Sequence, residues 1–216
     1  MNGIVMGGGA GLSMPTRFRV VTEKAVFSMP EASIGLFPDV GANYFLSRLP
    51  GFFGEYLGLS GARLDGAEIA ACGLATHFKL TSLENALQVL NSPNVSTISA
   101  LIETFAEKPN VKEDSPFSRL EVINKCFSKE TVEEIIESLE EHESENGAEK
   151  WITIALSFIR SSCPTSLKIF LKSWEPSKLE LVDEEMVNQY FRNINDEEWE
   201  YLRFPDRSNY QIACKL

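Results

Sequence analysis

The sequence lacks any cluster of lysine and arginine residues. Its 20 basic residues are outnumbered by 31 acidic ones, so the formal net charge at pH 7 is −11. A protein that binds nucleic acid needs a basic patch to neutralise phosphate groups, and anionic membranes attract basic segments in the same way. We therefore expect no nucleic-acid partner, and binding to an anionic membrane surface is disfavoured.

Long apolar runs and paired cysteines are also absent. No stretch approaches the roughly 18 consecutive apolar residues of a membrane-spanning helix, and the first residues carry neither a basic segment nor a cleavage site. We expect neither membrane insertion nor secretion. The cysteines lie far apart, without a Cys-x-x-Cys pair or a histidine at metal-binding spacing, which indicates reduced thiols in an intracellular protein and no metal site. They are Cys72, Cys126, Cys163 and Cys214.

Two common catalytic motifs are missing as well. The chain has no Gly-x-Ser-x-Gly elbow, which argues against an ordinary serine hydrolase, and no G-x-x-x-x-G-K-[ST] phosphate-binding loop. What it does have is three consecutive glycines, Gly7 to Gly9, between the apolar run at 3–6 and a segment that is typical of a helix.

The glycine triplet has two interpretations. Glycines at a helix start cost up to about 1 kcal/mol each relative to alanine, so something must lie close to this main chain. One interpretation is close packing between the strand and the helix. The other is that an unpaired N–H group at the helix start binds an acyl oxygen and stabilises negative charge on it, which is worth about 3 to 4 kcal/mol for one well-placed donor.

Two carboxylates follow the triplet. Glu31 stands after Met29-Pro30 at the end of an apolar strand, and Asp39 lies in the loop at 35–41. Each has a plain alternative, because Glu31 fits an exposed strand end and Asp39 fits the N-cap of the next helix. In a desolvated cleft, two such carboxylates take different roles: one acts as nucleophile or base, and the other recognises a hydroxyl group or transfers a proton.

The two histidines fit structural roles better. His77 stands among apolar neighbours with no obvious partner, so a structural histidine is favoured over a catalytic base. His142 lies in an acidic helix, where we expect it to be exposed.

Short apolar runs punctuated by glycine and proline predict an α/β arrangement up to about residue 80, and helical periodicity dominates beyond it. Near Val132 to Leu139, apolar residues recur at helical spacing opposite a row of glutamates, which we interpret as a solvated face. The expected strands are 3–6, 18–22 and 25–28, with a last one before residue 80. A first helix is expected to begin near Gly8 or Gly9, and further helices are expected at 42–49, 52–59, 65–72, 151–159, 163–173 and 183–191.

Three stretches carry a resemblance to a known family: Asn2 to Leu12 around the glycine triplet, Ala25 to Glu31, and Ile34 to Gly41. They closely resemble the enoyl-CoA hydratase/isomerase (crotonase) superfamily and, within it, the 3-hydroxyisobutyryl-CoA hydrolases. The stretches 162–168 and 174–191 resemble the C-terminal region of that subfamily. The resemblance implies a partial crotonase-type spiral of ββα units at 1–80, a connector at 81–115 and a helical C-terminal region at 116–216.

The resemblance also implies a chemistry: hydrolysis of the thioester of 3-hydroxyisobutyryl-CoA or a similar β-hydroxyacyl-CoA, a step of valine degradation. Gly8 falls on the family's oxyanion-binding N–H, Glu31 on its acid/base or nucleophilic glutamate, and Asp39 on the aspartate of the hydrolase branch. All three contact the substrate. Gly11 stands where hydratases keep a second glutamate, which disfavours hydration. Coenzyme A is part of the substrate, so no separate cofactor is expected.

Departures from the family leave other functions open. The family's N-terminal portion, with a second oxyanion donor, is expected to be missing ahead of Met1, and a gap is expected between Lys172 and Trp174. Enoyl-CoA hydratase or isomerase activity, or an inactive shortened isoform that associates with full-length relatives, remain alternatives. A homo-oligomer is a further expectation.

The last three residues suggest a cellular address. Cys214-Lys215-Leu216 is a near variant of the Ser-Lys-Leu peroxisomal signal, and the family includes peroxisomal plant members. We therefore expect localisation to the peroxisome and an import receptor as a partner.

Overall fold

The computed structural model describes residues 1–78 and 94–173 of the 216-residue chain. Within these ranges, no helix combines the length and the apolar character needed to cross a bilayer. The helix expected at 183–191 and the terminal Cys214-Lys215-Leu216 lie outside the described residues.

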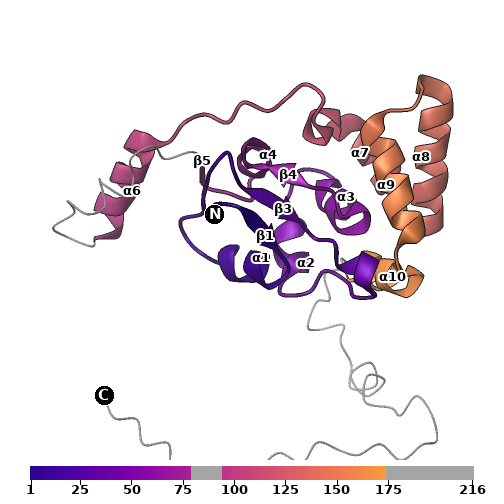
Figure 1. The fold of residues 1–216 in the computed structure, drawn as a ribbon, viewed down its shortest axis with the longest axis horizontal. Coiled ribbons are helices and arrows are strands. Elements are labelled where there is room, and N and C mark those ends of the chain that lie inside the picture. The colour runs from indigo at the N-terminus through magenta and orange to yellow at the C-terminus, as the bar shows by residue number, and fades with distance from the viewer. Residues whose placement is uncertain (79–93, 174–216) are drawn as a thin grey trace, which may run out of the picture. The chain divides into compact units, whose positions relative to one another are not determined.

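A three-stranded sheet in the order β1-β3-β4 forms the N-terminal layer. Strand β1 (Ile4–Met6) runs into helix α1 (Gly8–Ser13) and pairs in parallel with β3 (Val26–Ser28), as Figure 1 shows. Strand β4 (Leu64–Asp65) pairs with the other edge of β3 in antiparallel orientation. The β1–β3 register joins Ile4 to Val26, Val5 to Phe27 and Met6 to Ser28.

A second, two-stranded sheet joins β2 (Val20–Val21) in parallel to β5 (His77–Phe78). The strand expected at 18–22 is therefore shorter than predicted. Arg19, which was expected to lie within this strand, precedes it, and its carbonyl oxygen accepts the N–H groups of Thr76 and His77 at the start of β5. The helix before β5, α4 (Gly66–Ala71), begins at a capping box formed by Asp65 and Glu68, which matches the predicted helix at 65–72.

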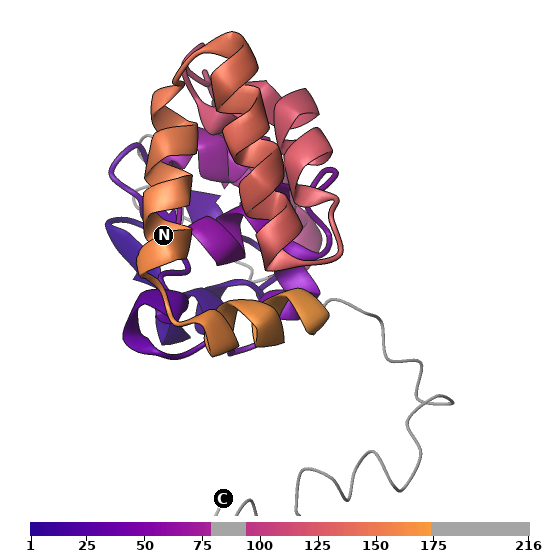
Figure 2. The same ribbon diagram turned by 90° about the vertical axis from the view of Figure 1, so that its right-hand side faces the viewer.

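Helix α3 (Phe53–Ser60) occupies the centre of the described core, and seven of its eight residues are buried. Helix α2 (Ala42–Leu46), shorter than the predicted 42–49, packs against it. Against α3 also pack α7 (Leu120–Phe127), α9 (Lys150–Ser161) and α10 (Pro164–Lys172). Figure 2 shows α9, α8 and α7 side by side with α10 crossing below them.

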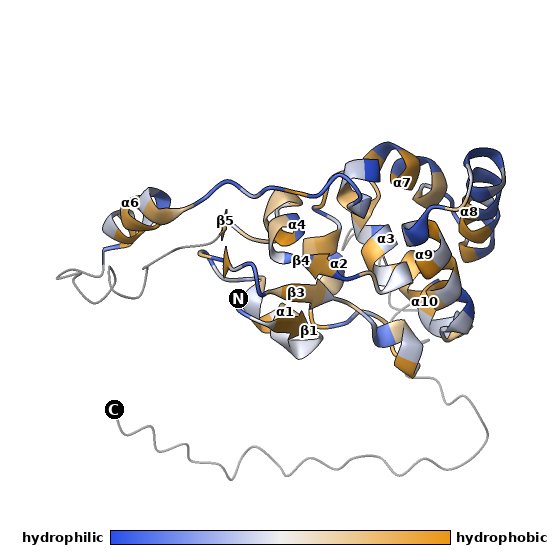
Figure 3. Cartoon of the chain, turned by 45° about the horizontal axis from the view of Figure 1, so that its top comes forward, coloured by the Kyte–Doolittle hydropathy of each residue, from blue (hydrophilic) through white to orange (hydrophobic). Residues whose placement is uncertain are grey.

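The acidic segment forms α8 (Val132–Asn146), which starts at a Thr131–Glu134 capping box. Its apolar side buries Val132, Ile135 and Leu139 against α7 and α9, while the row of glutamates is exposed, so the predicted solvated face is confirmed. Figure 3 shows hydrophilic and hydrophobic segments alternating along α8, whereas β1 and β3 are hydrophobic.

Helix α6 (Val95–Phe105) was not predicted, because this part of the chain reads as a connector. The side chain of Asn94 starts the helix by accepting the N–H of Ser96 at 2.8 Å. A short 3-10 helix, η2 (Pro116–Arg119), then leads into α7.

Close packing between α3 and α10 depends on one glycine. A Cβ added at Gly58 would overlap the ring of Phe170, which is fully buried. We therefore expect Gly58→Ala to lower the free energy of unfolding by about 1–3 kcal/mol through overpacking, measured by urea denaturation. The cost should shrink in a Phe170→Leu background, which removes the clashing ring atoms. An equal cost in both backgrounds would contradict this packing.

Candidate functional site

The parallel pairing of β1 and β3 brings two functional segments to one edge of the sheet. Because Met6 and Ser28 are in register, both strands end at the same level, and the residues that follow them lie side by side. Gly7 and Gly8 follow β1, and Glu31 follows β3 after Met29-Pro30. Figure 1 shows α1 leaving β1 beside β3 at this edge.

Gly7 is required by the backbone itself. It has φ 49° and ψ −127°, a combination that glycine alone adopts readily. This turn converts the strand into the helix, and the Gly7 carbonyl oxygen then accepts the N–H groups of Ala10 and Gly11 at 2.9 and 3.1 Å.

Gly8 and Gly9 need a different explanation. Both residues are exposed, and a Cβ added at either would meet nothing within 4 Å. Close packing of strand and helix therefore does not account for these two glycines. Their N–H groups belong to the first turn of α1, where a helix has no internal acceptor. The bare backbone at Gly8 is open to an approaching acceptor atom.

Glu31 is buried, with 6% of its surface exposed, so the alternative of an exposed strand end is wrong. It begins the 3-10 helix η1 (Glu31–Ile34). This short element is fixed to the helical part of the chain because the N–H of Cys163, at the start of α10, donates to the Ala32 carbonyl oxygen at 3.0 Å. The N–H of Leu36 closes the segment on the Glu31 carbonyl at 3.0 Å.

The Glu31 carboxylate faces the glycine turn. Its Oε1 lies 3.5 Å from the position that a Cβ of Gly7 would occupy. Its Oε2 is buried without a hydrogen-bond partner among the described residues. Burial raises the pKa of Glu31, a bond from the backbone partly offsets this, and the negative charge of Asp39 raises the pKa further. The group is therefore a poorly solvated carboxylate, which suits a base or nucleophile.

Asp39 lies in the exposed loop before α2, close enough to Glu31 for its charge to raise the pKa of Glu31. It is not the N-cap of that helix, because Gly41 holds that position and Asp39 contributes only its carbonyl oxygen, which accepts the N–H of Ala42 at 2.7 Å. Its carboxylate stays free of this turn. Glu31 is thus linked to both other predicted residues, through its contact with the turn that leads into Gly8 and through the charge of Asp39. Of the three residues, Glu31 is buried, whereas Gly8 and Asp39 are exposed.

The neighbouring residue Val40 was missed by sequence reasoning. It is the one non-glycine residue in the described ranges with positive φ, at 46°. A Cβ added at Gly11 would lie only 2.5 Å from the Cβ of Val40, so Gly11 is required by this contact. Two features of the sequence were available as a signal for this contact: Gly41 directly after Val40, and Gly11 in the middle of a predicted helix.

The histidines are placed elsewhere. His77, for which the sequence showed no obvious partner, has two: its Nδ1 lies 2.7 Å from Thr76 Oγ1 and its Nε2 lies 3.4 Å from Glu103 Oε1, as befits a structural histidine. His142 is not exposed as expected, because 12% of its side chain is accessible beside Glu149. Its helix position turns it toward α9 rather than toward solvent.

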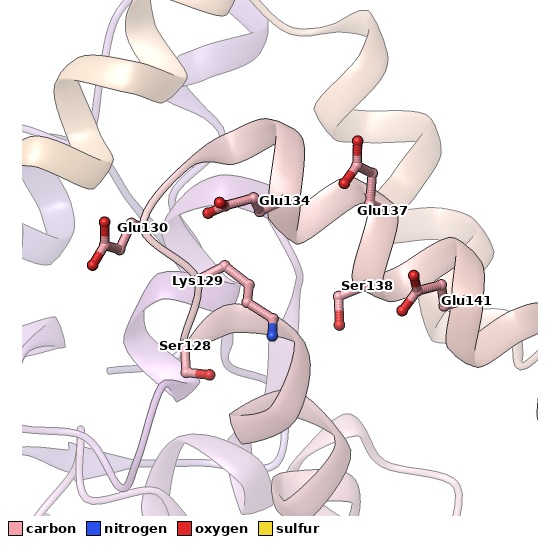
Figure 4. Close-up of a pocket in the computed structure, with 7 residues that line it drawn as sticks. All are labelled: Ser128, Lys129, Glu130, Glu134, Glu137, Ser138 and Glu141. Carbon is pink, nitrogen blue, oxygen red and sulfur yellow. The ribbon is translucent and has the colours of Figure 1, made fainter.

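The hollows found among the described residues are lined by residues other than Gly8, Glu31 and Asp39. Figure 4 shows one of about 310 Å³ at the turn between α7 and α8, lined by Lys129 and by glutamates that include Glu134, Glu137 and Glu141 of α8. In residues 1–78 and 94–173, no group of three or more histidine, cysteine or acidic side chains is placed to hold a metal. Cys72, Cys126 and Cys163 are free thiols.

Known proteins similar to this chain include two from Arabidopsis thaliana. A probable 3-hydroxyisobutyryl-CoA hydrolase 2 is 44% identical over 272 residues, which cover all of this chain and 72% of the relative. The 3-hydroxyisobutyryl-CoA hydrolase 1 is 52% identical over 194 residues, 88% of this chain and 51% of the relative. The first alignment is longer than this chain, so that relative contains segments without a counterpart here.

The expected peroxisomal localisation is contradicted by these comparisons. The human and bovine 3-hydroxyisobutyryl-CoA hydrolases, each 42% identical, are named as mitochondrial, and so is an Arabidopsis hydrolase-like protein at 41%. These names point to mitochondria. A three-residue pattern such as Cys-Lys-Leu occurs too often by chance to identify a localisation by itself.

A solved structure supports the fold. A carnitinyl-CoA dehydratase from Mycobacterium thermoresistibile superposes with a TM-score of 0.69 at 27% identity, over 91% of this chain and 68% of that one. The family model of enoyl-CoA hydratase/isomerase matches residues 1–191. Together with the strand–glycine–helix turn and the two carboxylates beside it, these matches show that the chain belongs to the enoyl-CoA hydratase/isomerase family.

Proposed function

We propose that this chain hydrolyses the thioester of 3-hydroxyisobutyryl-CoA or a closely similar β-hydroxyacyl-CoA, the reaction for which its relatives are named. The observation that carries the proposal is the buried Glu31 carboxylate, which lies against the Gly7 turn directly beside the exposed Gly8 amide. In valine degradation, this reaction releases the free hydroxy acid and coenzyme A.

In the proposed mechanism, the Gly8 N–H donates to the thioester carbonyl oxygen. Negative charge that develops on this oxygen during attack is thereby stabilised. Glu31 either removes a proton from a water that attacks the carbonyl carbon, or attacks this carbon itself and forms an anhydride that water then hydrolyses. In both cases the C–S bond breaks, and the departing coenzyme A thiolate takes up a proton that the consumed water supplies. Asp39 orients the hydroxyl group of the substrate or the water. The mechanism needs no cofactor beyond the coenzyme A that the substrate carries.

The raised pKa of Glu31 fits either role. A poorly solvated carboxylate binds a proton more strongly than one in water, so it is a stronger base once ionised. Its Oε2 is buried and has no hydrogen-bond partner among the described residues, so this oxygen is poorly solvated and keeps its capacity to accept a proton.

The hydratase alternative is disfavoured by Gly11. Hydratases of the resembled family place their second glutamate at this position, but a Cβ here would meet Val40 Cβ at 2.5 Å and its carbonyl oxygen at 2.7 Å. A glutamate cannot enter without displacing the loop that carries Asp39.

Replacing the proposed base should separate chemistry from folding. We expect Glu31→Gln to reduce hydrolysis of the thioester by about 10²- to 10⁴-fold. The thermal midpoint at pH 7 should not fall, because the substitution removes a charge whose burial opposes folding. A coupled thiol-release assay and thermal denaturation measure the two effects. Glu55→Gln is the matched control, since burial also raises the pKa of Glu55 on α3; a fully active Glu31→Gln would reject the proposal.

The pH dependence should respond to Asp39. Its negative charge raises the pKa of Glu31, so Asp39→Asn should lower that pKa and let Glu31 ionise at lower pH. The acidic limb of the profile of kcat/KM against pH therefore moves toward lower pH, even where the maximum rate falls. Glu121→Gln removes an exposed carboxylate of α7 and should leave the limb in place. An acidic limb that moved toward higher pH in Asp39→Asn would contradict the electrostatic coupling between Asp39 and Glu31.

Substrate choice tests the reaction type directly. The chain is assayed in parallel with a β-hydroxyacyl-CoA and with crotonyl-CoA. It should release thiol from the first and should not hydrate the second, which is measured as an unchanged enoyl absorbance. Hydration without thiol release would favour the hydratase alternative instead.

A further inference from the structure

Val40 has a backbone conformation that its own side chain disfavours. Its φ of 46° is sparsely populated for a β-branched residue. The next residue, Gly41, also has positive φ, at 83°. These are the two central residues of the turn from Asp39 to Ala42, a position that asparagine and glycine usually occupy.

Burial does not explain the valine. Its side chain remains 42% exposed, so the gain from removing it from water is small. The side chain lies against α1: its Cβ and Cγ2 are 2.5 and 2.8 Å from the position that a Cβ at residue 11 would occupy, so only glycine fits there. Strained residues of this kind gather where a functional group has to be held in place.

The strained residue directly follows Asp39. Moving the turn away from Gly11 would move the Asp39 carboxylate relative to Glu31, because only one peptide unit separates Asp39 from Val40. The other tie within the turn, from the Ala42 N–H to the Asp39 carbonyl oxygen, fixes the turn internally without fixing it to α1. The Val40–Gly11 contact, by contrast, joins this turn to α1, the helix of the oxyanion donor.

We propose that Val40 is a positioning residue for the hydrolysis: its side chain, lodged against Gly11, holds the Asp39 carboxylate in place beside Glu31. The inference rests on the proposed function and adds a steric clamp between α1, which carries Gly8, and the loop that carries Asp39. Shape, not hydrophobicity, is what the clamp requires of residue 40.

The kinetic test uses three variants of residue 40. Val40→Gly and Val40→Asn suit positive φ but remove the branched side chain, so they should be at least as stable as the parent chain and yet lose about tenfold in kcat at nearly unchanged KM. Val40→Thr keeps the branched shape and should retain the parent kcat. Ile169→Ala, a truncation of a similarly exposed residue on α10, serves as the control with full activity.

A double-mutant cycle distinguishes positioning from a general structural role. If Val40 acts through Asp39, then Val40→Gly causes no further loss of kcat in an Asp39→Asn background. Losses that multiply, or a Val40→Gly variant with the parent kcat, would overturn the inference. Loss of activity in Val40→Thr equal to that in Val40→Gly would also overturn it.

A second measurement needs no turnover and so separates this inference from the proposed function. The carboxyl pKa of Glu31, followed by ¹³C NMR titration, should fall in Val40→Gly toward its value in Asp39→Asn, because Asp39 is no longer held close. An unchanged Glu31 pKa in Val40→Gly would refute the clamp whether or not the chain hydrolyses thioesters. Full activity of Glu31→Gln would refute the proposed function while leaving this result intact.

Discussion

The parallel pairing of β1 with β3 is the constraint on which the site depends. Each strand is only three residues long, yet the Met6–Ser28 register places the end of one strand beside the end of the other. A parallel pair aligns the carboxyl ends of its strands, and the segments that follow converge outside that edge. The Gly8 amide and the Glu31 carboxylate come together for this reason, although 23 positions separate them in the sequence. A shift of one residue in this register would turn every side chain of the shifted strand to the opposite face and offset the two strand ends from one another.

At this edge of the sheet, the Glu31 carboxylate is buried, and burial disfavours its charged form. Glu31 begins a short helix tied to α10 through the Cys163–Ala32 hydrogen bond, and its carboxylate is buried without full hydrogen bonding among the described residues. A carboxylate placed only for stability would be paired or exposed. The burial of Glu31 and the strain at Val40 occur in the same segment, 31–40, and such unfavourable features are expected where function is kept at the expense of stability.

Much of this arrangement was predictable from the sequence because it is local. The glycine triplet after an apolar run indicated the strand–helix turn, the helix expected at 65–72 corresponds to α4, and the apolar spacing along α8 gave its buried face. The same local patterns pointed to Glu31 and Asp39 as partners. Strand ends were less predictable, since β2 loses residues to the hydrogen bonds that Arg19 makes with the entry to β5.

What the sequence could not reveal depends on long-range contacts. Val40 looks like an ordinary loop valine until Gly11, 29 positions earlier, is seen to lie against it. His142 was expected at the surface because its helical neighbours are acidic, but packing of α8 on α9 covers its side chain. His77 gains Glu103 as a partner only once α6 has formed, and α6 itself has a cap but little other local signal.

The central claim is that the Gly8 amide and the Glu31 carboxylate act on the same thioester carbon. The most direct measurement is ¹H–¹⁵N NMR of the labelled chain during titration with a non-hydrolysable ketone analogue, in which a methylene group replaces the thioester sulfur of the β-hydroxyacyl-CoA. The account predicts a downfield shift of the Gly8 amide proton as it donates to the ketone oxygen, and a simultaneous change in the Glu31 carboxyl resonance. Saturable binding of the analogue that leaves both Gly8 and Glu31 unaffected would contradict it.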